Sequence, residues 1–143
     1  MSPAYFDTSV FAKLLLREPG SDRAWESWLS ASPPLSCLVT LVEARAAMAA
    51  AFRSGRLDRS QHDDAKRALD ELWEEVSPIT LDRPLVDLAG ELAEAHALRG
   101  YDAVHLAAAL TTGAELFVSA DSDQLRAAQA ESMATLDPAA VAP

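Results

Sequence analysis

Four acidic residues stand at positions where secondary-structure elements are expected to begin or end. They are Asp7, Glu43, Asp102 and Asp121. Carboxylates that pack together repel one another, so either some of them take up protons or cations bind between them. The question for the rest of the chain is whether the fold brings these four side chains together.

The chemistry that such a group supports follows from its donor atoms. The sequence contains no cysteine cluster and no paired histidines at zinc spacing, and oxygen ligands alone favour a hard cation, Mg²⁺ or Mn²⁺. Such an ion lowers the pKa of bound water and orients it for in-line attack on a phosphodiester, and a second ion stabilises the leaving oxygen. The residue types therefore indicate phosphodiester hydrolysis with one or two ions per site.

The elements that must position these acids alternate between strand and helix. Strand-like runs cover residues 4–6, 35–39, 77–81, 116–120 and 133–137, and helical patterns cover 9–16, 21–32, 40–53, 58–76, 84–99, 98–112 and 122–130. No two strands are joined by a hairpin-length turn, which is typical of βαβ units and predicts a mostly parallel sheet of four to five strands between helical layers. We expect a single α/β domain over residues 1–143.

A parallel sheet of this kind binds its ligand outside the carboxyl ends of the strands. Asp7 and Asp121 follow the first and fourth expected strands, so both are predicted at that edge. Glu43 lies near the start of a helix that follows a strand, which places it in the same region. Asp102 follows a helix, so the topology alone does not position it.

Each acid except Asp7 also has a purely structural interpretation. Thr40 to Glu43 spells T-x-x-E, the capping box, in which the glutamate accepts from a backbone N–H. Asp102 and Asp121 fit helix N-caps, each worth about 0.5–2 kcal/mol. Gly100 fits the left-handed residue that ends the preceding helix.

Several neighbouring side chains have two readings that the residues alone leave open. Ser9 either hydrogen-bonds to Asp7 or caps the first helix. Arg45 and Arg99 lie close in sequence to two of the acids, where they would contact phosphate groups of a substrate or remain solvated. His105 falls three residues after Asp102, but a lone histidine on an apolar helix face is more typical of the core.

The charge, the cysteine content and the apolar runs of the chain limit its possible functions. The chain carries 12 basic and 22 acidic residues, a net charge of −10, which opposes binding to nucleic acid unless bound cations reverse the local sign. Cys37 is the only cysteine, which excludes an internal disulfide and fits a reducing compartment. With no secretory signal and no apolar run of membrane-spanning length, we expect a cytoplasmic protein with no membrane contact.

Four blocks together resemble a known family. They are YFDTSVFAKLLL at 5–16, VTLVEARAAM at 39–48, LRGYDAVHLAAAL at 98–110 and LFVSADSDQLRAA at 116–128. In this order and spacing they resemble the PIN domains, and within them the VapC-type toxins of bacterial toxin–antitoxin pairs. The resemblance runs from Tyr5 to about Asp137. It implies a PIN-like three-layer α/β/α sandwich.

The resemblance also implies an activity and its residues. It implies a metal-dependent endoribonuclease that leaves a 5′-phosphate and a 3′-hydroxyl. The four catalytic acids of the family fall on Asp7, Glu43, Asp102 and Asp121, and we take Asp7, with Asp102 and Asp121, as the metal ligands. Ser119 replaces the threonine often found before the fourth acid and keeps its hydroxyl. Asp123 is a further acid that either assists the site or favours its helix N-terminus.

The resemblance implies partners as well, namely an RNA substrate, a small VapB-like antitoxin whose segment occupies the acidic cleft, and a second copy of the chain. Two alternatives remain open at this point. One is an inactive PIN-like module that only binds a partner. The other is an aspartyl-phosphate protein, which normally needs a lysine late in the chain, whereas this sequence has only Lys13 and Lys66.

Overall fold

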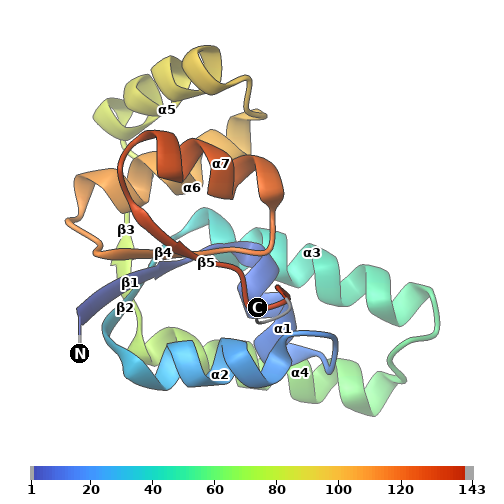
Figure 1. Ribbon diagram of the computed structural model, residues 1–143. Helices are drawn as coiled ribbons and strands as arrows, with labels where there is room; N and C mark the ends of the chain where they lie inside the picture. Colours follow the sequence, from blue (N-terminus) through green and yellow to red (C-terminus); the bar gives the residue numbers. More distant parts are fainter. Residues whose placement is uncertain (1, 141–143) are drawn as a thin grey trace.

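The computed structural model describes residues 2–140 and contains a five-stranded sheet in which every neighbouring pair is parallel (Figure 1). The strands are β1 (Ser2–Phe6), β2 (Ala31–Cys37), β3 (Ser77–Ile79), β4 (Leu116–Val118) and β5 (Ala134–Leu136). Their order across the sheet is β3-β2-β1-β4-β5. The mostly parallel sheet predicted from the alternation of strands and helices is confirmed.

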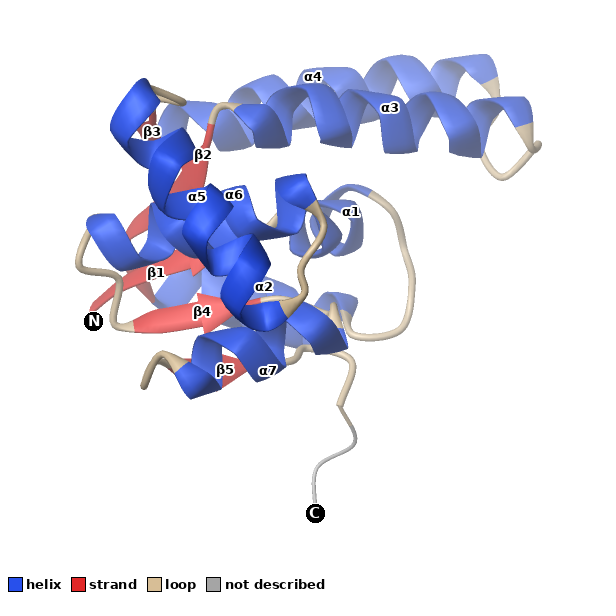
Figure 2. Cartoon of the chain, turned by 90° about the horizontal axis from the view of Figure 1, so that it is seen from above, coloured by secondary structure: helices blue, strands red, loops and turns tan. Residues whose placement is uncertain are grey.

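Helices cover both faces of this sheet. They are α1 (Thr8–Leu15), α2 (Ser21–Ser30), α3 (Val39–Arg53) and α4 (Arg59–Glu75) on one face, and α5 (Arg83–His96), α6 (Gly100–Thr111) and α7 (Ser122–Ala130) on the other. Figure 1 shows α5, α6 and α7 above the strands and α2 and α4 below them. Seen from above, α3 and α4 extend together beyond the sheet (Figure 2). The expected three-layer α/β/α arrangement is confirmed.

The alternation of side chains along β1 explains why both layers are needed. Tyr5 points into the core beneath α5–α7, while Phe6 points into the core beneath α1–α4, because successive strand residues face opposite sides of a sheet. Tyr5 stacks on Phe117 of β4 at a centroid distance of 5.7 Å, and Phe6 packs on Trp28 of α2 at 5.0 Å. Helices must therefore cover the strand on both sides.

The sheet order places a topological switch at β1. From β1 the chain moves to β2 and β3 on one side, and only later reaches β4 on the other side. In open parallel sheets the ligand site lies at such a switch, outside the carboxyl ends of the strands. Asp7 directly follows β1, and its backbone N–H donates to the carbonyl of Val118, the last residue of β4.

Two local expectations differ from the structure. Val39 belongs to α3 rather than to β2, which ends at Cys37. Gly100 is the first residue of α6, and the left-handed residue that ends α5 is Ala97 with φ 55°. The expected role of Gly100 is therefore wrong. The chain turns earlier because Leu98 is buried in the core beneath α5–α7, which requires the backbone to leave α5 before that residue.

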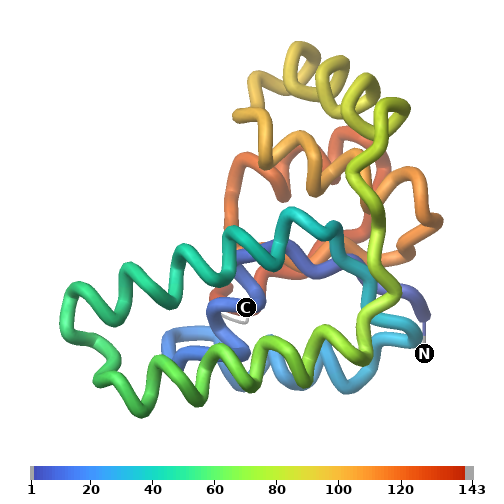
Figure 3. Tube along the Cα trace, turned by 180° about the vertical axis from the view of Figure 1, so that it is seen from behind, coloured from blue at the N-terminus to red at the C-terminus, as the bar shows by residue number. Residues whose placement is uncertain are grey.

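Two further features complete the architecture. The trace seen from behind shows α3 and α4 as an antiparallel pair running side by side (Figure 3). Among the residues that the structure describes, none of the helices is both long enough and apolar enough to cross a membrane.

Candidate functional site

Asp7 is the most buried acid of the four, with 1% of its surface exposed. Its Oδ1 accepts hydrogen bonds from Ser9 Oγ at 2.6 Å and from the Val10 backbone N–H at 3.3 Å, and its Oδ2 accepts from Ser119 Oγ at 2.7 Å. Burial raises the pKa of Asp7 above its usual value, although these hydrogen bonds oppose the shift. A nearby cation would favour the charged form of this carboxyl.

The two serines also tie together the loops that follow β1 and β4. Ser9 Oγ accepts from the backbone N–H of Ala120 at 2.9 Å, and Ser119 Oγ accepts from the backbone N–H of Asp121 at 3.0 Å. Of the two readings of Ser9, the bond to Asp7 is the one that forms, because Asp7 itself caps α1. Ser9 and Ser119 thus fix the orientation of Asp7.

Glu43 reaches the same edge from α3. Its Oε1 accepts from Thr8 Oγ1 at 2.6 Å and hydrogen-bonds to His105 Nε2 at 2.7 Å. Burial raises the pKa of Glu43, but the hydrogen bonds from His105 and Thr8 and the charge of Arg99 lower it by more, so the net shift is downward. Glu43 is therefore an ionised carboxylate at neutral pH.

The capping-box interpretation of Glu43 is wrong. Helix α3 begins at Val39, and no side chain caps it at Leu38. The Thr40 hydroxyl instead shares a hydrogen bond of 2.8 Å with Ser36 Oγ. Because the helix starts before Thr40, the backbone N–H groups that a T-x-x-E box would satisfy are not at its N-terminus.

Asp102 and Asp121 are joined through Gln124 and Arg99. Asp102 accepts from Gln124 Nε2 at 3.0 Å and from Arg99 Nε at 3.0 Å. Asp121 caps α7, accepting from the backbone N–H groups of Asp123 and Gln124, and its Oδ2 lies 3.8 Å from the Arg99 guanidinium. The N-cap interpretation is correct for Asp121. It is wrong for Asp102, which lies inside the first turn of α6 because that helix begins at Gly100.

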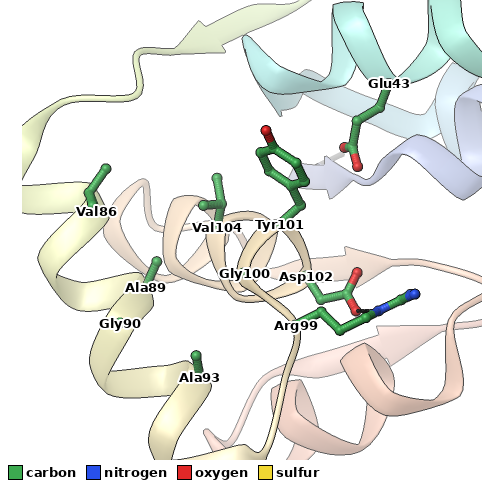
Figure 4. Close-up of a pocket in the computed structure, with 10 residues that line it drawn as sticks. All are labelled: Glu43, Val86, Ala89, Gly90, Ala93, Arg99, Gly100, Tyr101, Asp102 and Val104. Carbon is green, nitrogen blue, oxygen red and sulfur yellow. Dashed lines mark hydrogen bonds and ion pairs between the residues drawn. The ribbon is translucent and has the colours of Figure 1, made fainter.

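Arg99 lies between Asp102 and Asp121, and Figure 4 shows its pair with Asp102. Its hydrogen bond to Asp102, together with the charges of Asp102, Asp121 and Asp123, raises the pKa of its guanidinium. The Arg99 side chain is 84% exposed. Asp123 is held by an ion pair with Arg126 at 2.9 Å. Arg45 is exposed on α3.

Two residues of this network were not predicted as part of the site: the sequence assigned His105 to the core and gave Gln124 no role. His105 is buried, as expected of a core histidine, but it also contacts Glu43 and the Tyr5 hydroxyl. Its position one turn after Asp102 was the available signal. Gln124 is buried and touches both Asp102 and Asp121, while its Oε1 has no hydrogen-bond partner in the structure. Its position three residues after the capping acid was the signal there.

A pocket of about 650 Å³ opens beside this network, between α5 and α6 (Figure 4). Its walls are apolar, formed in part by Val86, Ala89 and Val104, and its charged rim carries Glu43, Arg99 and Asp102. The Tyr101 ring lies at its mouth and is 60% exposed. An apolar hollow with acids at one end is suited to a polar ligand that also has a flat or apolar part.

A comparison with known families identifies the architecture. The family model for the PIN domain matches residues 4–130. The chain belongs to the PIN domain family. This PIN domain is 45% identical over 113 residues to Ribonuclease VapC45 of Mycobacterium tuberculosis (strain CDC 1551 / Oshkosh) and to Ribonuclease VapC49 of M. tuberculosis (strain ATCC 25618 / H37Rv). Each alignment covers 79% of this chain and 78% of the relative. The family resemblance seen in the sequence is confirmed.

Solved structures agree with this fold. PAE2754 from Pyrobaculum aerophilum superposes with a TM-score of 0.71 at 20% identity, covering 96% of this chain and 84% of that one. M. tuberculosis VapC20, a Sarcin-Ricin loop cleaving toxin, gives 0.67 at 22% identity, covering 87% and 94%. A toxin–antitoxin complex from Klebsiella pneumoniae gives 0.68 at 17% identity, covering 94% and 97%. At these identities the likeness establishes the fold.

The arrangement of this PIN domain disfavours an aspartyl-phosphate protein. Such a protein needs a lysine beside the phosphorylated carboxyl. Lys13 Nζ instead donates to Glu18 and to the carbonyl of Pro19, and Lys66 pairs with Asp63 on α4. Neither lysine is among the hydrogen-bond partners of Asp7, whose oxygens accept from two serines and a backbone amide.

The possible metal-ligand atoms near these acids are of the chemical type that binds a hard cation. Among residues 2–140, no three side chains of aspartate, glutamate, histidine or cysteine are grouped closely enough to hold one ion together. The Arg99 guanidinium, however, is shared by Asp102 and Asp121, so these two carboxylates already converge on one positive charge. The carboxylate and hydroxyl oxygens around these acids suit Mg²⁺ or Mn²⁺.

Proposed function

We propose that this PIN domain is a metal-dependent endoribonuclease and the toxin of a VapBC-type toxin–antitoxin pair. The observation that carries the proposal is the meeting of four acids at the β1–β4 switch. Ser119 links Asp7 to Asp121, and Arg99 links Asp121 to Asp102. Glu43 accepts from Thr8, the residue next to Asp7. The side chains come from four separate parts of the chain. The similarity to proteins named ribonucleases supports the same activity.

In this proposal Asp7, Asp102 and Asp121 hold one or two Mg²⁺ or Mn²⁺ ions. When bound, such ions activate water and neutralise the charge that develops on the scissile phosphate. Ser9 and Ser119 keep both oxygens of Asp7 in a fixed orientation. Arg99, freed from its two carboxylates, and Arg45 then contact RNA phosphates at the rim.

Glu43 has a separate role in the proposal. Both of its hydrogen bonds reach Oε1, so Oε2 is the oxygen that orients or deprotonates the attacking water. The lowered pKa of Glu43 keeps this carboxylate ionised and able to accept a proton at neutral pH. Glu43 also lines the pocket whose mouth carries Tyr101, where a single-stranded base of the RNA would lie.

The net charge of −10 supports metal dependence. An acidic protein repels the phosphate backbone, and RNA binding is strongly electrostatic. Bound divalent ions become the largest local charges and reverse the sign of the site. We therefore expect RNA binding, as well as cleavage, to require the cation.

The proposed partners follow from the same site. A basic side chain of a small antitoxin would replace Arg99 between Asp102 and Asp121, which blocks the cation site. A second copy of the chain would place two such sites next to one another. Because the substrate is cellular RNA, the proposal places the protein in the cytoplasm.

The test uses purified protein, free of antitoxin, with structured RNAs in Mg²⁺, Mn²⁺ or EDTA. We expect cleavage with either metal, none in EDTA, and a loss of about 10²-fold or more in Asp7→Asn and Asp102→Asn. Asp87→Asn is the matched control, because Asp87 is an exposed acid paired with Arg83 on α5, and it should cleave normally. Cleavage that persists in EDTA, or in both site variants, would contradict the proposal.

One observation favours a second candidate, an inactive module that binds a partner without cleaving RNA. Arg99 already satisfies two of the acids, so the site could serve only to receive a protein segment. A Mn²⁺ titration separates the two candidates. The nuclease binds the ion through its acids, whereas the inactive module shows no binding that Asp7→Asn removes.

A further inference from the structure

A buried path of hydrogen bonds leads from the sheet to Glu43. The backbone N–H of Cys37 on β2 donates to Tyr5 Oη at 3.2 Å. Tyr5 Oη lies 2.7 Å from His105 Nδ1, and His105 Nε2 lies 2.7 Å from Glu43 Oε1. Tyr5 has no exposed surface and His105 has 1%. The path therefore joins β1, β2, α6 and α3 inside the protein and ends at the site.

We propose that Tyr5 and His105 are positioning residues, which hold the neutral imidazole with its proton on Nε2 and thereby fix Glu43 with Oε2 toward the substrate. This inference rests on the proposed function for the role of Glu43. It concerns a carboxylate outside the three proposed metal ligands.

Counting hydrogens along the path gives the direction of each bond. A backbone N–H can only donate, so Tyr5 Oη accepts from Cys37 and has one hydrogen of its own to place. Burial raises the pKa of the Tyr5 hydroxyl well above its usual value, so it keeps that hydrogen. His105 Nδ1 lies 2.7 Å away and accepts this hydrogen, which leaves the ring proton on Nε2.

The other protonation states leave a polar group unsatisfied. An imidazolium would donate from Nδ1 to Tyr5 Oη, which already accepts from Cys37, and the tyrosine hydrogen would then lose its acceptor in the core. A neutral ring protonated on Nδ1 would turn the lone pair of Nε2 toward the ionised Glu43. Buried groups without a hydrogen-bond partner are unfavourable, so the Nε2–H tautomer is the one that satisfies the whole path.

The Nε2–H tautomer of His105 fixes the orientation of the Glu43 carboxylate. Its Oε1 receives Nε2–H of His105 and the hydroxyl of Thr8, and two donors on one oxygen hold the carboxylate plane. Oε2 then remains available to water or RNA. Without the Tyr5 hydroxyl the ring can exchange tautomers, and Glu43 loses one of its two donors for part of the time.

Tyr5→Phe isolates this effect from packing. The Tyr5 ring stacks on Phe117 and makes an edge contact with the His105 ring at 5.8 Å, and phenylalanine preserves both contacts. Ser21→Ala is the matched control. It also removes a buried hydroxyl, one that donates to the Leu16 carbonyl and accepts from the Glu18 backbone N–H and lies off the path.

The first measurement does not depend on RNA cleavage. NMR of protein labelled with ¹⁵N-histidine, near pH 7.5, reports the protonation state of each ring, and His105→Gln assigns the signal among the three histidines. We expect His105 as the Nε2–H tautomer in the wild type and in Ser21→Ala, and a mixture of states in Tyr5→Phe. A wild-type ring protonated on Nδ1, or on both nitrogens, would overturn the proposal even if the protein is an active ribonuclease.

The second measurement is a double-mutant cycle on RNA cleavage. Tyr5 and Glu43 share no hydrogen bond, so coupling between them must pass through His105. We expect Tyr5→Phe to lower kcat about 10-fold with little change in KM, as for other residues that orient a site ligand. In a Glu43→Gln background the same change should have almost no effect. His105→Gln, whose amide can still donate to Glu43, should retain more activity than His105→Ala. An equal effect of Tyr5→Phe in both backgrounds would refute a positioning role.

Discussion

The site has two halves that hold their carboxylates in different ways. We name the halves after the groups that hold the acids. In the buried half, Asp7 and Glu43 accept hydrogen bonds from hydroxyls and a buried imidazole packed against the sheet, although the Glu43 side chain is itself 27% exposed. In the exposed half, Asp102 and Asp121, themselves 13% and 24% exposed, share the guanidinium of Arg99, a side chain that is 84% exposed. The first half is preorganised by the core. The second is held by a side chain that can leave when a ligand or cation arrives.

The buried half also contains a contrast of its own. Burial leaves the pKa of Asp7 raised, whereas the donors around Glu43 lower the pKa of that group despite its burial. In the absence of metal, the environment of Asp7 therefore favours the protonated carboxyl, whereas the environment of Glu43 favours the ionised carboxylate. The difference suits the proposed roles. Asp7, as a metal ligand, can lose its proton when the cation binds, whereas Glu43 must already be charged to orient water.

The largest expected effect comes from removing the support of Asp7. In Ser9→Ala combined with Ser119→Ala, Asp7 keeps its carboxyl but loses the hydroxyl donor to each oxygen, and only the Val10 backbone N–H remains. We expect RNA cleavage to fall about 10- to 100-fold and the free energy of unfolding to fall by about 1–3 kcal/mol. Initial rates and urea denaturation measure the two changes. Ser30→Ala is the control, because that hydroxyl is exposed at the end of α2. Unchanged cleavage would show that the buried half needs no preorganisation.

A smaller effect is expected in the exposed half. Arg99→Gln removes the positive charge that competes with a cation for Asp102 and Asp121. Because the arginine is solvent-exposed, we expect Mn²⁺ affinity to rise only about 2- to 5-fold, measured by isothermal titration calorimetry. Arg126→Gln, which breaks the ion pair with Asp123, should leave it unchanged. A fall in Mn²⁺ affinity in Arg99→Gln would contradict the idea that this side chain must leave.

The smallest effect concerns the two acids of the buried half. An acid with a raised pKa costs stability as the pH rises from its unfolded-state pKa to its folded-state pKa, so Asp7→Asn should gain stability relative to the wild type toward neutral pH. An acid with a lowered pKa contributes stability above its unfolded-state pKa and loses it as the pH falls through the folded-state pKa. Glu43→Gln should therefore lose stability at neutral pH, and the loss should shrink in acid.

Thermal unfolding in EDTA between pH 4 and pH 7.5 measures both differences. We expect them to be on the order of 2–4 °C in Tm and of opposite sign at pH 7.5. Two variants that shift in the same direction with pH would show that the two carboxyls do not have opposite pKa shifts.

The parts of the fold and of the site that depend on local sequence patterns could be predicted from the sequence. Alternating strands and helices predicted the parallel sheet, and the rule for its carboxyl edge placed Asp7 and Asp121 where the structure has them. The N-cap role of Asp121 follows from the polar residue before a helical run. These features depend on residues a few positions apart, which is why sequence patterns reveal them.

The parts that sequence could not predict depend on contacts between distant segments. His105 meets Glu43 across 62 positions and Tyr5 across 100, and no local pattern encodes such a meeting. The capping box at Glu43 failed because α3 begins before Thr40. The prediction that Gly100 ends α5 was wrong because the burial of Leu98 makes the chain turn at Ala97. In each case tertiary packing overrode a local preference.

The most direct measurement of the central claim is a Mn²⁺ titration of the wild type beside Asp7→Asn from the buried half and Asp121→Asn from the exposed half. If acids of both halves form one cation site, each substitution should weaken or abolish the same binding event, seen as loss of the same heat signal by calorimetry. Wild-type binding that survives either substitution unchanged would mean that the two halves do not share a cation.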